Sequence, residues 1–171
     1  MVLSLKILDK NFRQNIARYV FQCCLATITI LLILLFLDVL EETAILASLG
    51  ATAFIVFTMP NAYSSHPRRL IGGYVVGVVV GLVCYFIITS SFFNSLPVSH
   101  TISVAVFGAI AVGIAIFVMV ATDTEHAPAA GIALGLILNE WEYSTVVFIV
   151  SAVIVMASVR KILKPLLIDL I

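Results

Sequence analysis

The sequence predicts an all-α integral membrane protein, a polytopic helix bundle that crosses the bilayer several times. Hydrophobic residues make up 63% of its 171 residues and charged residues only 11%. A water-soluble domain averages about 45–50% apolar and about 25% charged residues, so one soluble core could not hide this much apolar surface. The mean hydropathy of +1.23 agrees. We therefore expect residues 1–171 to form a single transmembrane domain embedded in the lipid bilayer.

Six apolar stretches, separated by charged residues, prolines and polar clusters, predict six helical segments. A spanning helix needs about 20 residues, with about 17 as the usual lower limit, and four stretches approach or exceed that limit. The first is too long for the core of a cleavable signal peptide, about 7–15 residues, so we expect it to remain as a span. The stretches are 19–37, 44–59, 70–88, 102–121, 129–138 and 144–159.

The charge distribution predicts how often the chain crosses. Short loops rich in Lys and Arg stay on the cytoplasmic side. Six crossings place every basic residue on one side, whereas five would send the last basic cluster to the other side. We therefore expect a multi-pass protein of the cell membrane with a cytoplasmic amphipathic N-terminus (1–18) and a cytoplasmic C-terminal tail (160–171). The basic residues are Lys6, Lys10, Arg13, Arg18, Arg68, Arg69, Arg160, Lys161 and Lys164, and the acidic residues expected outside are Asp38, Glu41, Glu42, Glu140 and Glu142.

The fifth stretch, 129–138, is unusually short. Ten helical residues rise about 15 Å, half of the roughly 30 Å hydrocarbon core. Two interpretations fit this length, a short or partly unwound crossing and a re-entrant loop. The charge argument favours the crossing, since only an even number of crossings returns the C-terminus to the basic side.

The order of the spans also predicts a 3+3 inverted repeat with a short fifth helix. Transporters built this way often carry short or interrupted helices at matching positions of the two halves, next to the binding site. In a chain rich in Ala, Leu and Gly, chance identities at one chosen shift are the alternative explanation. A shift of 85 residues superposes Asp38 on Asp123, Ala44 on Ala129, and Leu49-Gly50 on Leu134-Gly135.

Three glycines form a stripe in the third span. Gly73, Gly77 and Gly81 are spaced four residues apart, which places them on one helix face and is typical of close helix packing in membranes. The contact is either within the chain or between two copies. The second alternative predicts a homo-oligomer.

The segment around His126 is the first candidate binding site. It leads from a polar stretch to Pro128, a residue tolerated in the first turn of a helix, and then to Ala129, Ala130 and Gly131. A helix N-terminus offers unpaired N–H groups and a partial positive charge, which favour an anion. His126 would add a hydrogen bond or a proton. The plainer interpretation is that Pro128 only starts a helix while His126 lies in interfacial water.

Polar residues of the second span and of the following loop complete the candidate site. Ser48, Gly50 and Thr52 would line a polar path from the other half of the repeat, although Ser and Thr in membrane helices also satisfy backbone carbonyls. His66 and Arg68 lie near the cytoplasmic mouth, where basic residues attract anions but more often only set topology.

Several classes of function find no support in the sequence. No basic face interleaved with aromatic residues indicates nucleic-acid binding. The three cysteines, Cys23, Cys24 and Cys84, lack metal-ligand spacing. No hydrolase, metalloprotease or P-loop motif occurs, so we expect no enzymatic activity and no cofactor.

Three motifs together resemble the HPP family of integral membrane proteins. They are Ser48-Leu49-Gly50-Ala51-Thr52-Ala53, His66-Pro67-Arg68 leading to Ile71-Gly72-Gly73, and His126-Ala127-Pro128-Ala129-Ala130-Gly131. Ala127 replaces the first proline of the family's His-Pro-Pro segment, and His66-Pro67-Arg68-Arg69 replaces the usual Gln-Pro-Arg-Asn, so the chain resembles a divergent member.

The resemblance implies transport of a small inorganic anion, with nitrite as the first candidate because relatives from chloroplasts and cyanobacteria are associated with nitrite. Two other classes remain open at this point. One is a membrane assembly or scaffold subunit that uses the glycine stripe. The other is an intramembrane enzyme with a polar site at Asp123, Glu125 and His126.

Overall fold

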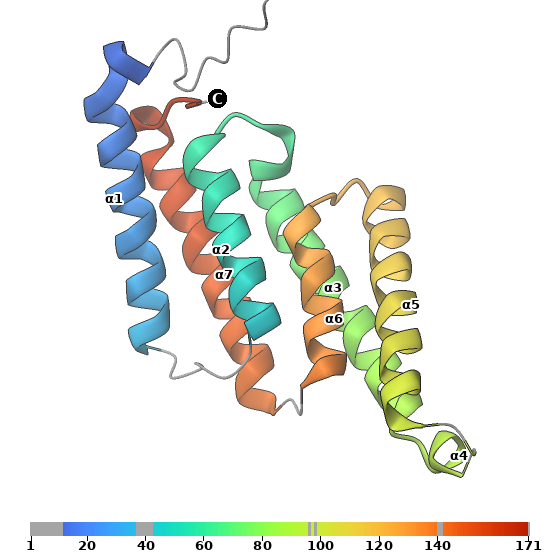
Figure 1. Cartoon of the computed structure of the whole chain (residues 1–171). Coiled ribbons are helices and arrows are strands. Elements are labelled where there is room, and N and C mark those ends of the chain that lie inside the picture. The colour runs from blue at the N-terminus through green and yellow to red at the C-terminus, as the bar shows by residue number, and fades with distance from the viewer. Residues whose placement is uncertain (1–11, 37–42, 96, 98, 140–141, 171) are drawn as a thin grey trace, which may run out of the picture.

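The computed structural model describes residues 12–36, 43–95, 97, 99–139 and 142–170, and within this part every regular element is helical. The order of elements along the chain is shown in Figure 1. The elements are α1 (Phe12–Phe36), α2 (Thr43–Thr58), the 3₁₀ turn η1 (Tyr63–Ser65), α3 (Pro67–Ile88), the short α4 (Ser91–Asn94), α5 (His100–Ala121), α6 (Ala127–Leu138), α7 (Tyr143–Leu163) and the 3₁₀ turn η2 (Lys164–Leu166).

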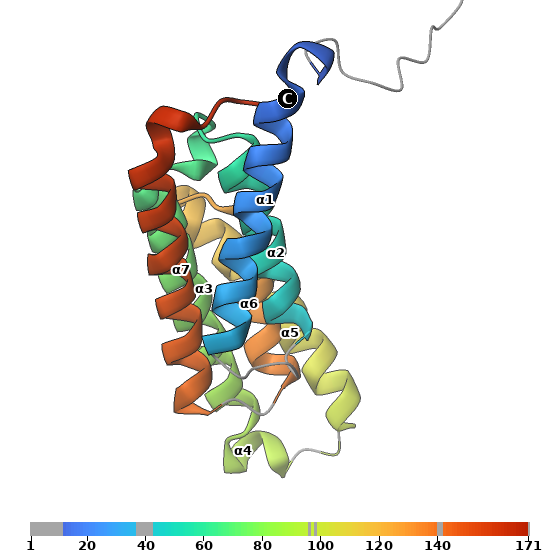
Figure 2. The ribbon, with the colours of Figure 1, turned by 90° about the vertical axis from the view of Figure 1, so that its left-hand side faces the viewer.

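The predicted all-α membrane fold is confirmed. Helices α1, α3, α5 and α7 are long and apolar enough to cross a membrane, whereas α2 and α6, with 16 and 12 residues, are shorter apolar helices. These six helices match the six predicted stretches. They alternate in direction, so that the start of α1 and the end of the chain lie at the same end of the bundle, opposite α4 (Figures 1 and 2).

Helix α6 lies in the interior and packs against α2, α3 and α5. The chain enters α6 from the end at which α5 finishes and leaves it at the end at which α7 starts (Figure 1). It therefore traverses the bundle rather than turning back as a re-entrant loop. Ala129, Ile132 and Ala133 are fully buried, so the middle of this short helix is enclosed by neighbouring helices, as membrane-embedded helices too short to span alone require.

The glycine stripe of α3 packs against α6 of the same chain. A Cβ atom on Gly77 would clash with the carbonyl oxygen of Ala129, and one on Gly81 would lie 3.0 Å from the Cα of Ala133. Of the two predicted uses of Gly73, Gly77 and Gly81, the structure takes the intrachain one. A homo-oligomer stays a prediction, since the structure describes one copy of the chain.

The last described residues fasten α1 to the bundle. The buried amide of Gln22 donates to the carbonyl oxygen of Ile168 at 2.9 Å and accepts from its N–H at 3.3 Å. The Tyr19 hydroxyl donates to the carbonyl oxygen of Leu170. The N–H of Leu170 in turn donates to the carbonyl oxygen of Thr58. The predicted tail therefore folds back onto α1 and α2 instead of extending away.

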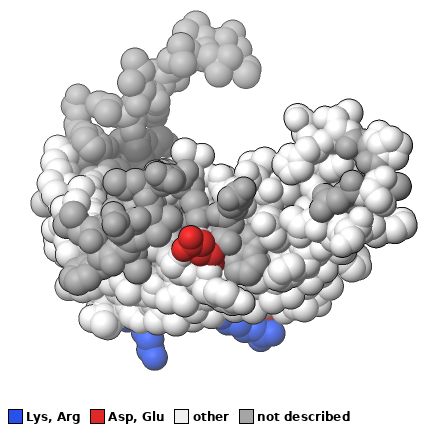
Figure 3. Space-filling model, turned by 90° about the horizontal axis from the view of Figure 1, so that it is seen from below, with Lys and Arg blue, Asp and Glu red and all other residues white. Residues whose placement is uncertain are grey.

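Charge is unevenly distributed between the two ends of the described bundle. The basic residues of α3 and of the α7–η2 region lie at the end that also holds Phe12 and the C-terminus, together with Asp123, Glu125 and Asp169. Among the described residues, the opposite end, seen in Figure 3, shows one acidic patch and is otherwise uncharged; the basic groups at the edge of that view belong to the other end. Most residues of the predicted acidic side, namely Asp38, Glu41, Glu42 and Glu140, lie outside the described residues, as do residues 1–11 of the predicted N-terminal segment.

Candidate functional site

His126 is a buried residue at the junction of three elements. It precedes α6 as the N-cap residue, and its relative exposure is 1%. Its Nε2 lies 2.9 Å from the hydroxyl of Thr52 on α2, and its Nδ1 lies 2.9 Å from the carbonyl oxygen of Ser64 in η1. The expectation that His126 lies in interfacial water is wrong, since both ring nitrogens have protein partners.

The network continues from Thr52 to a tyrosine of α3. The hydroxyls of Thr52 and Tyr74 are 2.7 Å apart, and the Tyr74 hydroxyl also lies 3.2 Å from the carbonyl oxygen of Ser48, an alternative acceptor for its single hydrogen. The rings of Tyr74 and His126 lie 5.7 Å apart. Both Thr52 and Tyr74 are at least 98% buried. Tyr74 is not among the predicted site residues, and its one signal in the sequence is a hydroxyl within an apolar span.

The partners of the imidazole determine which nitrogen carries its proton. A carbonyl oxygen only accepts hydrogen bonds, so Nδ1 must be protonated to bond with Ser64. In the neutral ring Nε2 then accepts, and the Thr52 hydroxyl donates to it. Tyr74 in turn donates to Thr52. Polar groups so deep among apolar helices are costly to bury unless paired, and here all of them are.

A cavity of about 270 Å³ adjoins this network between α5 and α6. Its walls from α5 are apolar, and its polar groups come from the connection before α6. Since Ala127 and Ala130 belong to the first turn of α6, the cavity meets the N-terminus of that helix, where N–H groups lack partners within the helix. The lining residues are Ile116, Met119, Val120, Glu125, His126, Ala127 and Ala130.

The small residues after His126 allow α6 to approach its neighbours closely. As predicted, Pro128 lies in the first turn of α6. A Cβ atom on Gly131 would clash with the hydroxyl oxygen of Ser48, and that hydroxyl itself donates to the carbonyl oxygen of Ala44 at 2.9 Å. Ala129 is buried against α3 near Gly77. The predicted meeting of the second span with the start of the fifth is thus present.

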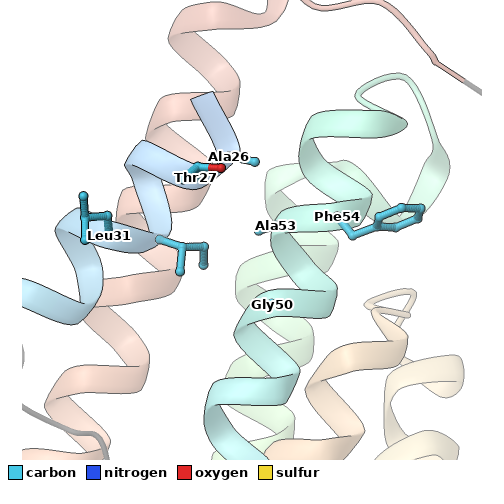
Figure 4. Close-up of a pocket in the computed structure, with 7 residues that line it drawn as sticks. Ala26, Thr27, Leu31, Gly50, Ala53 and Phe54 are labelled. Atoms are coloured by element: carbon cyan, nitrogen blue, oxygen red, sulfur yellow. The ribbon is translucent and has the colours of Figure 1, made fainter. Parts of the chain in front are cut away.

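Gly50 lies apart from this cluster. No neighbouring atom lies within 4 Å of the position that its Cβ would take. It lines a different cavity, of about 470 Å³, between α1 and α2, bordered by Ala26, Thr27, Ile30, Leu31, Ala53 and Phe54. In Figure 4 Ala26, Thr27 and Leu31 of α1 stand across this space from Ala53 and Phe54 of α2. Its lining is almost entirely apolar.

His66 and Arg68 are exposed at the start of α3. The basic residue in contact with the connection before α6 is the neighbouring Arg69. Its guanidinium lies 2.7 Å from a carboxylate oxygen of Asp123 and 3.5 Å from one of Glu125, over the ring of Tyr63. The negative charge of Glu125 beside the cavity is thereby offset.

Asp123 shapes this connection through its backbone and its charge. Its φ of 56° is the one positive value among the described non-glycine residues, a conformation that Asp adopts more readily than most residues. The hydrogen bond from Tyr63, together with Arg69, lowers the pKa of the Asp123 carboxyl below its ordinary value. Arg69 and Tyr63 thus hold the chain that leads into His126.

Within the described residues, no group of three or more His, Cys, Asp or Glu side chains is placed to hold a metal ion. The arrangement instead offers hydroxyl, imidazole and backbone groups beside a small cavity. Such groups can bind a small polar solute and pass a proton along hydrogen bonds.

Comparison with known proteins identifies the family. No curated protein and no solved structure matches the chain. The family model described as HPP, transmembrane region, matches residues 11–164. That match covers helices α1 to α7 and every residue of the His126 network, so the chain belongs to the HPP transmembrane-region family of membrane proteins.

Proposed function

We propose that the protein transports a small inorganic anion across the cell membrane, with nitrite as the first candidate. The observation that carries this proposal is the cavity at the N-terminus of α6, bordered by His126 and joined to a buried polar network. Buried polar groups in a membrane bundle are costly and commonly mark solute pathways. Its volume of about 270 Å³ leaves room for a triatomic or tetra-atomic anion together with water.

Most of the cavity wall is apolar, and the groups that favour an anion lie where it meets α6. The first turn of α6 contributes a partial positive charge, worth about 0.3–2 kcal/mol to an ion. A hydrogen bond to a charged group adds about 1.5–3 kcal/mol, which the N–H groups of that first turn supply. His126, whose ring nitrogens bond to Thr52 and Ser64, acts on the anion through its positive charge when it is protonated. Arg68, exposed at the basic end, raises the local anion concentration.

An inverted repeat of two three-helix halves accounts for the central position of α2 and α6. The shift of 85 residues carries Phe36, the end of α1, onto Ala121, the end of α5. It also carries Thr43, the start of α2, to within one residue of the start of α6. α1 and α5 run in opposite directions (Figure 1). The correspondence does not extend to the third helix of each half. The same shift carries Pro67, the start of α3, to position 152, but α7 begins nine residues earlier, at Tyr143.

The orientation that we propose has the basic end in the cytoplasm, because Lys- and Arg-rich segments stay inside. The basic residues of α3 and α7 then form the inner mouth, and α4 lies outside. We propose no catalytic role for His126, since its ring nitrogens are engaged in a network that contains no carboxylate.

Uptake into liposomes tests the function. Purified protein is reconstituted and uptake of nitrite, nitrate, formate and chloride is measured. We expect concentration-dependent uptake of nitrite, and a loss of most of it in Ala127→Leu, whose added side chain fills the cavity from an exposed position.

Gly113→Leu is the matched control for that variant. It adds the same side chain to α5 at a position with no neighbour within 4 Å, so uptake should be preserved. Failure of the wild type to take up any of the four anions contradicts the proposed function. Normal uptake by a well-folded Ala127→Leu variant places the pathway elsewhere.

A further inference from the structure

We infer that His126 binds a proton together with the transported anion, so that the proton is a co-substrate. The inference rests on the proposed function for the anion. Its own basis is the chain of hydrogen bonds that runs from Ser64 through His126, Thr52 and Tyr74 to Ser48.

This chain can be satisfied in two directions. With a neutral imidazole, Tyr74 donates to Thr52 and Thr52 donates to Nε2. When Nε2 gains a proton it becomes a donor, so it donates to Thr52, Thr52 donates to Tyr74, and Tyr74 donates to the carbonyl oxygen of Ser48, 3.2 Å away. Nδ1 donates to Ser64 in both states. The backbone carbonyls at the two ends only accept, so protonation reverses the hydroxyls without leaving a polar group unpaired.

The charge of the protonated ring needs a partner that the described residues do not supply directly. From α3, the titratable group that faces His126 is Tyr74. From α2 and η1, the ring meets the Thr52 hydroxyl and the Ser64 carbonyl, and the α5 side of the shared cavity is apolar. Glu125 lines the same cavity but is paired with Arg69.

An anion in the cavity supplies that missing charge. Burial opposes a lone imidazolium and also a lone anion, but the two together are neutral and attract each other strongly where water is scarce. By linkage, the anion must then strengthen proton binding by the same factor by which the proton strengthens anion binding. The proton enters Nε2 as the anion enters the cavity, and both leave together, so no net charge crosses the bundle.

Transport measurements provide the first test. Liposomes containing the full chain are given nitrite with and without an inward proton gradient, and protein-free liposomes correct for diffusion of nitrous acid. We expect the gradient to stimulate protein-dependent uptake and His126→Gln to abolish this stimulation. Protein-dependent uptake that is indifferent to the gradient overturns the inference while leaving the proposed anion transport intact.

The pH profile separates the network from a merely structural role of its residues. Thr52→Val removes the acceptor that Nε2–H needs. Hydrogen bonds to charged groups are about twice as strong as neutral ones, so half-maximal uptake should move to lower pH by about one unit, equivalent to about 1.4 kcal/mol. Tyr74→Phe keeps Thr52 as the acceptor, so this variant should also lower the pH of half-maximal uptake, but by less than Thr52→Val does.

Thr58→Val is the matched control. It removes another threonine hydroxyl from α2, one bonded only to the carbonyl oxygen of Phe54, and should leave the pH profile unchanged. Equal profiles for wild type and a well-folded Thr52→Val variant contradict the inference.

A spectroscopic measurement tests proton binding by His126 even if no anion uptake is detected. In ¹⁵N-histidine NMR of the whole protein in lipid nanodiscs, with His126→Gln for assignment, we expect Nδ1 of His126 to stay protonated and Nε2 to gain its proton on acidification between about pH 8 and 5. Nitrite should move that transition to higher pH. Absence of the transition even in the presence of nitrite, or a transition that nitrite leaves unmoved, overturns the inference whatever the flux result.

Discussion

Buried hydroxyl groups in this bundle have specific partners because lipid offers none. Thr52 and Tyr74 are paired with each other, and Ser48 and Thr29 each donate to a carbonyl oxygen four residues earlier in their own helix, as the less buried Thr58 also does. The first pair joins two helices, whereas the others only satisfy local backbone. A threonine in an apolar span therefore has two quite different roles, and spacing along the chain does not distinguish them.

At the residue scale, the ion pair of Arg69 with Asp123 should make stability depend on pH. The pKa of Asp123 is lowered in the folded protein, so its contribution is complete above the unfolded-state pKa and is lost as pH falls through the lowered folded-state value. Thermal unfolding in detergent, followed from neutral pH down to about pH 3, should therefore show an acid-induced fall in Tm.

Arg69→Gln should lower Tm at neutral pH and flatten this fall, since one of the groups that lower the pKa is removed. Arg68→Gln is the control, because Arg68 is exposed, has no ion pair among the described residues and acts on the Asp123 carboxyl only as the smallest of the causes that lower its pKa; this variant should flatten the fall much less. Identical curves for the two variants would show that the ion pair does not stabilise the fold.

At the scale of elements, helix α6 explains the glycines of α3. A buried helix must be approached closely on several sides to exclude voids, and in lipid close approach between backbones is itself a main source of helix association. Gly73, Gly77 and Gly81 provide this surface on one side, while Gly131 provides it toward Ser48. Small residues of α3 and of α6 itself thus allow α6 to pack closely against α3 and α2.

Substituting Gly77 tests this packing. Gly77→Leu should destabilise the bundle by at least about 1–3 kcal/mol, the usual cost of overpacking, because even its Cβ atom would clash with the backbone of Ala129. Val79→Leu is the control in the same helix, since Val79 is 54% exposed. The measurement is thermal unfolding in detergent, and equal losses in the two variants would show that α3 and α6 are not in close contact.

At the scale of the whole molecule, six alternating helices bring the start of α1 and the end of the chain to one end of the bundle (Figures 1 and 2). The hydrogen bonds from Tyr19 and Gln22 to Leu170 and Ile168 tie these ends together. An odd number of crossings could not give this arrangement.

Reporter fusions test the topology. We expect reporters placed before residue 1 and after residue 171 to give the same cytoplasmic signal, since the basic clusters lie at that end. A reporter inserted after Ser95, beyond α4 at the other end, should give the opposite signal. Different signals from the two termini would contradict the six-crossing arrangement.

The sequence by itself determined that this protein is embedded in lipid, where its helices lie, and that a polar segment precedes α6. Long apolar runs such as 102–121 dictate helices because lipid leaves the backbone no other partner. Pro128 marks the start of α6 because the first turn lacks intrahelical partners in any case. The conjunction of His126 with small residues was also visible, and Ser48 and Thr52 were placed opposite it by the predicted repeat.

Only the tertiary structure decided which of these residues meet. Tyr74 joins Thr52 and His126 through contacts between residues 22 and 52 positions apart in the chain, and Arg69 rather than Arg68 reaches Asp123. Neighbouring residues of a helix point about 100° apart, so a small rotation of α2 or α3 exchanges the residue that faces the interior for one that faces lipid. In a chain that is apolar on nearly every face, hydrophobic periodicity does not fix that rotation; the close packing around α6 does.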